Sequence, residues 1–135
     1  MLSWYCWKRK WVIQMLNCLC VGIGGFIGSV LRYLVGLIPI NPSNGFPIKT
    51  FTINILGAFA LGLIAAIASK NSNMSEPVML MLKVGVCGGF TTFSTFAYEA
   101  TNLIQGGSTG LGIVYMLLSM VLGVASIILA QLLIN

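Results

Sequence analysis

Four long apolar stretches alternate with short polar segments along the 135 residues of the chain. The stretches cover about residues 15–38, 48–69, 77–105 and 111–133, and Pro, Gly, Ser and Asn are common between them. A helix needs about 20 mainly apolar residues to cross a bilayer, whose hydrocarbon core is roughly 30 Å thick. The pattern therefore predicts an all-α integral membrane protein with four transmembrane helices, located as a multi-pass protein in the cell membrane.

The third apolar stretch is interrupted near its middle. Its residues 88–96 read Gly-Gly-Phe-Thr-Thr-Phe-Ser-Thr-Phe. Each glycine weakens a helix by about 1 kcal/mol relative to alanine, and hydroxyl side chains compete for backbone groups. An unbroken helix over this stretch would be roughly 43 Å long, which exceeds the hydrocarbon core. We therefore predict a break near the middle of the third helix, with the freed backbone carbonyls of residues 88–91 buried in protein or lining a cavity.

Composition restricts the function that such a protein can have. Of its residues 58% are hydrophobic and only 7% are charged, which excludes a soluble globular domain. The chain has no histidine, and its carboxylates are Glu76 and Glu99, so acid–base catalysis has almost nothing to work with. The formal net charge is +5, but only Lys8, Arg9 and Lys10 are clustered, and this cluster suits a membrane surface. We expect neither an enzyme nor a nucleic-acid partner.

The N-terminal residues differ in character from the rest of the chain. Three tryptophans and a tyrosine flank the basic triplet at 8–10, which is typical of an interfacial anchor. We therefore divide the chain into a lead over residues 1–15 and a four-helix domain over residues 16–135. Four spans put both termini on one side, and the positive-inside rule places that side in the cytoplasm. Almost all of this bias comes from the triplet, so the domain alone could insert in either orientation.

Each apolar stretch carries a few small or polar residues that would share one helix face. Gly24, Gly28 and Arg32 are spaced by four residues in the first stretch, where the glycines would let another helix approach closely. Polar residues in membrane helices usually face the bundle interior or a water-filled cavity. The candidate hydrogen-bonding groups for such a cavity are Thr50, Asn54, Thr92, Ser94, Thr95, Tyr115 and Ser119, together with the ring edges of Phe93 and Phe96.

These groups are rich in donors and poor in negative charge, since the carboxylate of Glu99 lies only near the end of the cluster. Such a path suits an anion rather than a cation. The freed carbonyls of residues 88–91 suit the opposite ligand, a small hard cation such as Na⁺. Structural interpretations compete with these: the phenylalanines could simply pack, and Asn54 could join two helices. Arg32 could snorkel to the interface, and Glu99 could pair with a lysine or lie among the headgroups.

Three motifs together resemble the CrcB/Fluc family of fluoride channels. The longest is Gly85-x-Cys87-Gly-Gly-Phe-Thr-Thr-Phe-Ser-Thr-Phe96-x-x-Glu99. Two others are similar to the family's second-helix and first-helix motifs, Thr50-Phe-Thr-Ile-Asn54-Ile-Leu-Gly57-Ala-Phe-Ala-Leu-Gly62 and Gly24-Gly25-x-x-Gly28-x-x-x-Arg32-Tyr33. The resemblance covers residues 20–133.

The resemblance implies a dimer of four-helix subunits inserted antiparallel, with two fluoride pathways at the interface. A structural Na⁺, which is not transported, would be held by the main-chain carbonyls of Gly88 and Thr91. The implied pathway residues are Asn54, Phe93, Phe96, Tyr115 and Ser119 with the hydroxyls of Thr92, Ser94 and Thr95, while Arg32, Thr50 and Glu99 take vestibule or structural places. The implied function is passive export of cytoplasmic fluoride, which would give fluoride resistance.

Two features depart from the family pattern, and they leave the partner open. Lys49 stands where the family often has glycine, and the basic, Trp-rich lead is unusual. The partner is either a second copy, which we favour, or a paralogous subunit of fixed opposite topology.

A small multidrug exporter would need an acidic residue in the first span, and residues 15–38 contain none. A non-transporting scaffold would explain the glycines but not the broken third helix.

Overall fold

The computed structural model describes residues 2–40, 42–71 and 74–134, and the described chain is helical with short connections. The elements are α1 (Leu2–Gly36), α2 (Ile48–Lys70), α3 (Glu76–Leu80), the π-helix η1 (Met81–Cys87), α4 (Gly88–Phe90), α5 (Phe93–Gln105) and α6 (Thr109–Ile134). Within the described residues, four helical stretches are long and apolar enough to cross a membrane: Trp11–Gly36, Ile48–Lys70, Glu76–Gln105 and Thr109–Ile134. The predicted all-α fold with four membrane-length helices is confirmed.

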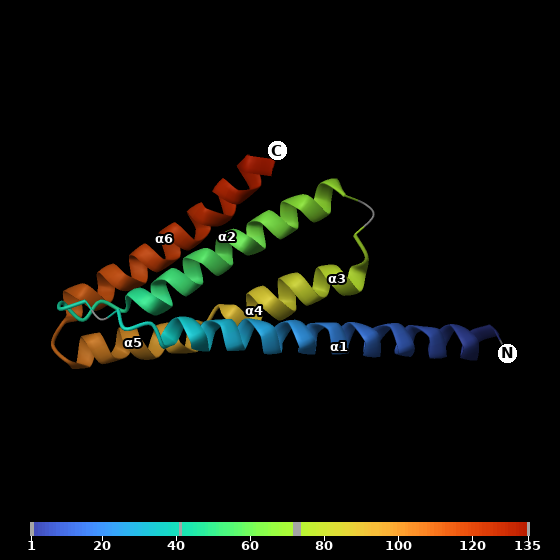
Figure 1. Ribbon diagram of the computed structural model, residues 1–135, viewed down its shortest axis with the longest axis horizontal. Coiled ribbons are helices and arrows are strands. Elements are labelled where there is room, and N and C mark those ends of the chain that lie inside the picture. Colours follow the sequence, from blue (N-terminus) through green and yellow to red (C-terminus); the bar gives the residue numbers. More distant parts are fainter. Residues whose placement is uncertain (1, 41, 72–73, 135) are drawn as a thin grey trace.

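The helices form two packed pairs. α1 packs along α3, η1 and α4, while α2 packs along α6, and α5 joins the pairs through its contact with α6. Figure 1 shows the pairs close together at the end where α5 and α6 are connected and diverging toward the end where α2 stops. The pairing places the break in the third span between α1 on one side and α2 on the other.

α1 is longer than the predicted first span. It runs without interruption from Leu2 to Gly36, so it joins the predicted lead to the first transmembrane helix. The Nδ2 atom of Asn17 donates to Oε1 of Glu76 at 3.4 Å, which places Asn17 level with the start of α3. In Figure 1 the part of α1 before this contact extends beyond the other helices toward the N-terminus. The lead therefore continues the axis of the first helix, and no change of backbone conformation marks residue 15.

The third span is broken, as predicted, but the break lies later than the glycine pair. α3, η1 and α4 follow one another directly, and Gly88–Phe90 is helical. The chain becomes extended at Thr91, with φ −75° and ψ 157°, and at Thr92, with φ −148° and ψ 118°. The break predicted near the middle of the span is confirmed, and the structure places its extended residues at 91–92.

Two glycines near the break serve helix packing instead. A Cβ atom built on Gly85 would lie 2.8 Å from the Cα atom of Gly24, and one on Gly89 would lie 2.6 Å from the carbonyl oxygen of Gly25. Only glycine allows this backbone-to-backbone approach of α1 to the third span. Gly88 differs, because it is exposed and a Cβ atom there would meet nothing within 4 Å.

Candidate ion pathway

Asn54 of α2 binds both backbone groups of Thr92 at the break. Its Nδ2 donates to the Thr92 carbonyl oxygen at 3.0 Å, and its Oδ1 accepts from the Thr92 N–H at 2.8 Å. The side-chain amide thereby replaces the helical bonds that an extended Thr92 cannot make. An amide NH₂ group has two N–H donors, so one donor of Asn54 is not used by this pair. The helix-joining interpretation of Asn54 is confirmed, and it leaves a donor for a ligand.

Thr92 restarts the helix after the break. Its Oγ1 accepts from the N–H of Thr95 at 3.2 Å and donates to Oγ1 of Thr95 at 3.0 Å, and Oγ of Ser94 lies 3.4 Å away. A threonine at this N-cap position satisfies one of the N–H groups that every helix start leaves free. Thr92 is buried, whereas Ser94 and Thr95 are exposed. The hydroxyl cluster therefore has a local structural purpose, and its outward members remain accessible.

Arg32 reaches the break from α1. Its Nη1 donates to the Thr91 carbonyl oxygen at 3.3 Å. Gly28, one turn earlier, lets α1 approach so closely that a Cβ atom there would be 2.2 Å from the Val86 carbonyl oxygen. The guanidinium is thus bound to a freed carbonyl of the break, which simple snorkelling to the interface does not explain.

Glu99 joins three helices through its carboxylate. Oε1 accepts from Oγ1 of Thr50 at 2.8 Å, and Oε2 accepts from the hydroxyl of Tyr115 at 2.9 Å. Thr50 is 5% exposed and Tyr115 is fully buried. No lysine pairs with Glu99 among the residues that the structure describes, and the neighbouring Lys49 donates instead to the Gly36 carbonyl at 3.0 Å. The Tyr115 hydroxyl, counted above as a donor for an anion, is therefore engaged by protein.

Four aromatic rings form a row from the break to the loop before α2. Ring centroids are 5.7 Å apart for Phe93 and Phe96, 5.1 Å for Phe96 and Tyr115, and 5.4 Å for Tyr115 and Phe46. Phe93, at one end, is 79% exposed. Ring edges carry the positive part of the aromatic quadrupole, so the row offers weak electropositive contacts along its length. Phe46 was not among the predicted residues, because its place in a turn-rich loop carries no periodic signal.

Ser119 lies one turn after Tyr115 on α6. Its Oγ atom is buried and has no hydrogen-bond partner in the described part of the chain. Hydroxyls in membrane helices usually bond back to a carbonyl of their own helix, as Ser126 does to Gly123 at 2.8 Å. A buried hydroxyl without a partner indicates a place for water or an ion. Ser119 is therefore an available donor beside the aromatic row.

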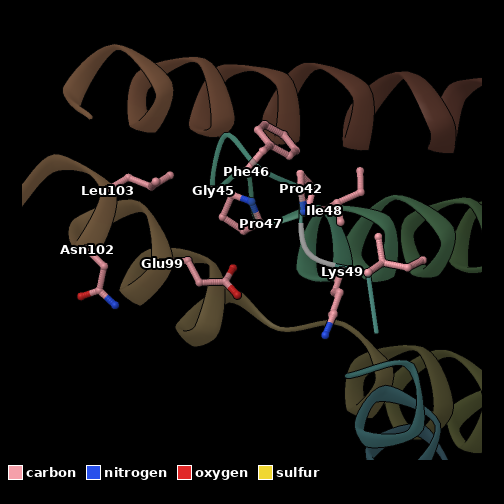
Figure 2. A pocket seen from close by; sticks show the side chains of 10 residues that line it. Pro42, Gly45, Phe46, Pro47, Ile48, Lys49, Glu99, Asn102 and Leu103 are labelled. Atoms are coloured by element: carbon pink, nitrogen blue, oxygen red, sulfur yellow. The ribbon is translucent and has the colours of Figure 1, made fainter. Parts of the chain in front are cut away.

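Two open pockets lie at the ends of this set of residues. The first, which we call the loop-end pocket, has a volume of about 460 Å³ and is lined by the loop before α2 with Lys49, Glu99 and Asn102. Figure 2 shows Glu99 extending from α5 toward this loop. The second has a volume of about 330 Å³, and its lining includes Asn54, Leu61, Lys83, Cys87, Gly88, Thr91, Thr92 and Phe93. We call it the α2–η1 groove, after the elements on its two sides.

Comparison with known proteins decides the family. The family model described as "CrcB-like protein, Camphor Resistance (CrcB)" matches residues 19–131, which is most of the chain. The chain belongs to the CrcB family. Membership in CrcB confirms the resemblance seen in the three sequence motifs. Together with the four membrane-length helices, it shows that the chain is a multi-pass protein of the cell membrane and not an enzyme.

Curated CrcB relatives carry the name "Fluoride-specific ion channel FluC". One from Ruminiclostridium cellulolyticum is 40% identical over 122 residues, covering 89% of this chain and 93% of the relative. One from Chlorobaculum tepidum is 48% identical over 93 residues, covering 69% and 74%. One from Agrobacterium fabrum is 41% identical over 114 residues, covering 84% and 91%.

Proposed function

We propose that this protein is a fluoride channel that exports cytoplasmic fluoride passively and so confers fluoride resistance. The observation that carries the proposal is a row of donors and ring edges without a free carboxylate. One N–H of Asn54 is unused, the Ser119 hydroxyl has no partner among the described residues, and both oxygens of Glu99 already accept bonds from protein. The names of the curated relatives support fluoride as the ion.

The chemistry of the row suits fluoride in particular. Fluoride is small and holds its water strongly, so a pathway must offer compact donors in place of that water. Amide N–H, serine O–H and ring-edge C–H groups are such donors, and a narrow row of rings limits the passage of the larger chloride ion. Asn54, Ser119, Phe93 and Phe96 are therefore the proposed pathway residues. The buried Tyr115 contributes its ring, because its hydroxyl donates a hydrogen bond to Glu99.

We further propose that two copies pair antiparallel around a structural Na⁺. A single chain leaves Phe93 79% exposed and Gly88 uncovered beside the open α2–η1 groove, which a second copy would cover. The Gly88 carbonyl lacks the N–H partner of a continuous helix, because the Thr92 N–H donates to Asn54. The carbonyls of Gly88 and Thr91 from two copies would supply four oxygen ligands, which suit a hard cation. Thr91 shares its carbonyl with Arg32, and an oxygen with two lone pairs can accept both.

Removal of sodium tests the paired arrangement. We expect the purified protein in detergent to elute as a dimer in NaCl and to lose thermal stability when Na⁺ is replaced by the larger choline cation, since binding to the folded state stabilises it. Light scattering gives the mass, and a thermal melt gives the stability. A terminal tag in vesicles is expected to be accessible from both faces. A monomer in both salts, or a tag on one face only, would contradict the antiparallel homodimer, and the latter would favour a paralogous partner.

Fluoride efflux tests the channel itself. Liposomes loaded with fluoride are expected to empty rapidly through the wild-type protein, and Phe93→Ile is expected to slow this about tenfold or more, because the exposed ring edge is lost. A fluoride electrode records the efflux, and Phe26→Ile serves as the control because Phe26 is also exposed, at 72%, on the unrelated α1. Equal passage of chloride, or efflux that requires a proton gradient, would contradict the proposal.

A further inference from the structure

A lysine lines the α2–η1 groove inside the third membrane-length helix. Lys83 belongs to η1, is half-buried, and shares the groove with Asn54, Gly88 and Thr91. No hydrogen bond or ion pair joins its ammonium group to another residue in the part of the chain that the structure describes. The third-helix motif begins two residues later, at Gly85, and the other two motifs lie in α1 and α2, so neither the motifs nor the pathway described above accounts for Lys83.

The π-helical conformation explains how Lys83 comes to face the groove. In a π-helix each N–H bonds to the carbonyl five residues earlier, so residues four and five apart lie on neighbouring turns. Lys83 therefore lies above Cys87 and Gly88, and both of these residues line the same groove. Single π-turns inside α-helices occur frequently at functional sites. Here the wide turn places the positively charged Lys83 in the groove beside the break of the helix.

The charge of Lys83 has no counterpart in the described part of the chain. The two carboxylates are engaged elsewhere: Glu76 accepts from Asn17 of α1, and Glu99 accepts from Thr50 and Tyr115. The residues that line the groove include no carboxylate. An ionised side chain within a membrane span is costly, and it usually marks a substrate or ion route. A mobile anion in the groove is the partner that this cation lacks.

We propose that Lys83 is the anion-recruiting group at the entrance of the pathway where α2 ends and α3 begins. This inference rests on the proposed channel function. It adds an entry step that does not distinguish one anion from another. The ammonium attracts anions electrostatically into the groove, where the unused Asn54 donor and the edge of Phe93 then take over. Recruitment of this kind acts on the entry of every anion, and selection for fluoride follows further along the row.

The competing occupant is a lipid phosphate. Lys83 lies seven residues after Glu76, about 10 Å along the helix, and a lysine stem at that depth can snorkel to the headgroups. The two sources of negative charge are distinguished by the lipid. A recruiting lysine acts in vesicles of neutral phosphatidylcholine as well as in vesicles that contain anionic phosphatidylglycerol.

Fluoride efflux from liposomes tests the proposal with three variants of the full chain. In low salt and low-millimolar fluoride, Lys83→Met is expected to slow efflux about three- to tenfold, with the loss shrinking at high ionic strength or saturating fluoride. Lys83→Arg is expected to keep the wild-type rate, because it keeps the charge. Lys70→Met, at the end of α2 outside the groove, removes the same charge and is expected to change efflux little. The ratio of fluoride to chloride permeation is expected to stay constant in all three.

Each other outcome decides against the inference. Lys83→Met at the wild-type rate, a loss of equal size in Lys70→Met, or a loss confined to phosphatidylglycerol vesicles would each overturn recruitment by Lys83. Dimer elution of Lys83→Met on size exclusion shows that its loss is not a folding defect. A wild-type protein that passes no fluoride would contradict the channel itself, whereas a conducting wild type with an unaffected Lys83→Met contradicts only the role of this lysine.

Discussion

Replacement of Asn54 by aspartate is expected to abolish fluoride efflux from liposomes, by about a hundredfold or more. Aspartate cannot donate to the Thr92 carbonyl, and it removes the second amide N–H that we propose for the ion. Its negative charge would also face an entering anion, and two like charges about 4 Å apart at an effective dielectric constant near 20 repel by roughly 4 kcal/mol. A fluoride electrode measures the efflux from liposomes of matched protein content.

The same substitution at Asn44 provides the control. Asn44 is exposed in the loop before α2, and its Oδ1 only accepts a bond from the Phe46 N–H at 3.0 Å. Aspartate preserves that acceptor, so Asn44→Asp is expected to conduct like the wild type. If Asn54→Asp kept more than a tenth of the wild-type rate, the amide would be a structural link and no part of the ion path.

Replacement of Gly28 by alanine is expected to have the largest effect on folding. The new Cβ atom would lie 2.2 Å from the Val86 carbonyl oxygen and 2.7 Å from the Phe90 nitrogen. Both are backbone atoms that cannot rotate away, so α1 has to move from η1 and α4, and overpacking of this kind costs about 1–3 kcal/mol. The movement would also withdraw Arg32 from the Thr91 carbonyl. We therefore expect a lower melting temperature and a loss of fluoride efflux together.

Gly22→Ala is the matched control on the same helix. A Cβ atom there would meet nothing within 4 Å, and alanine is a better helix former than glycine by about 1 kcal/mol. This variant is expected to be at least as stable as the wild type, with normal efflux. A Gly28→Ala protein with the wild-type melting temperature would contradict the close packing of α1 against the third span.

The features that sequence reasoning predicted correctly depend on neighbouring residues. The four membrane-length helices follow from runs of apolar residues, and their positions agree with the structure to within a few residues. The interruption of the third helix follows from hydroxyl side chains that compete with the helical hydrogen bonds. The close approach of α1 follows from the spacing of Gly24 and Gly28. Each of these features depends on residues within one local segment of the chain.

The features that it missed depend on which helices meet. The glycine pair looked like part of the break because glycine weakens an isolated helix, yet Gly89 packs against Gly25 and stays helical. Glu99 looked free to pair with a lysine, yet Thr50 and Tyr115 come from two other helices to bind it. These partners lie 49 and 16 residues away in the chain, so no local pattern could identify them.

By itself, the sequence determined the class of this protein, its four spans, the supply of donors and the shortage of negative charge, because hydropathy and side-chain chemistry do not depend on tertiary contacts. The tertiary structure alone decided where the third helix breaks and which donors remain. The Asn54 amide binds the backbone of Thr92, Arg32 donates to the Thr91 carbonyl, and the Tyr115 hydroxyl donates to Glu99. The physical reason is that a buried polar group must find a partner, and only the packed helices determine which partner each group finds.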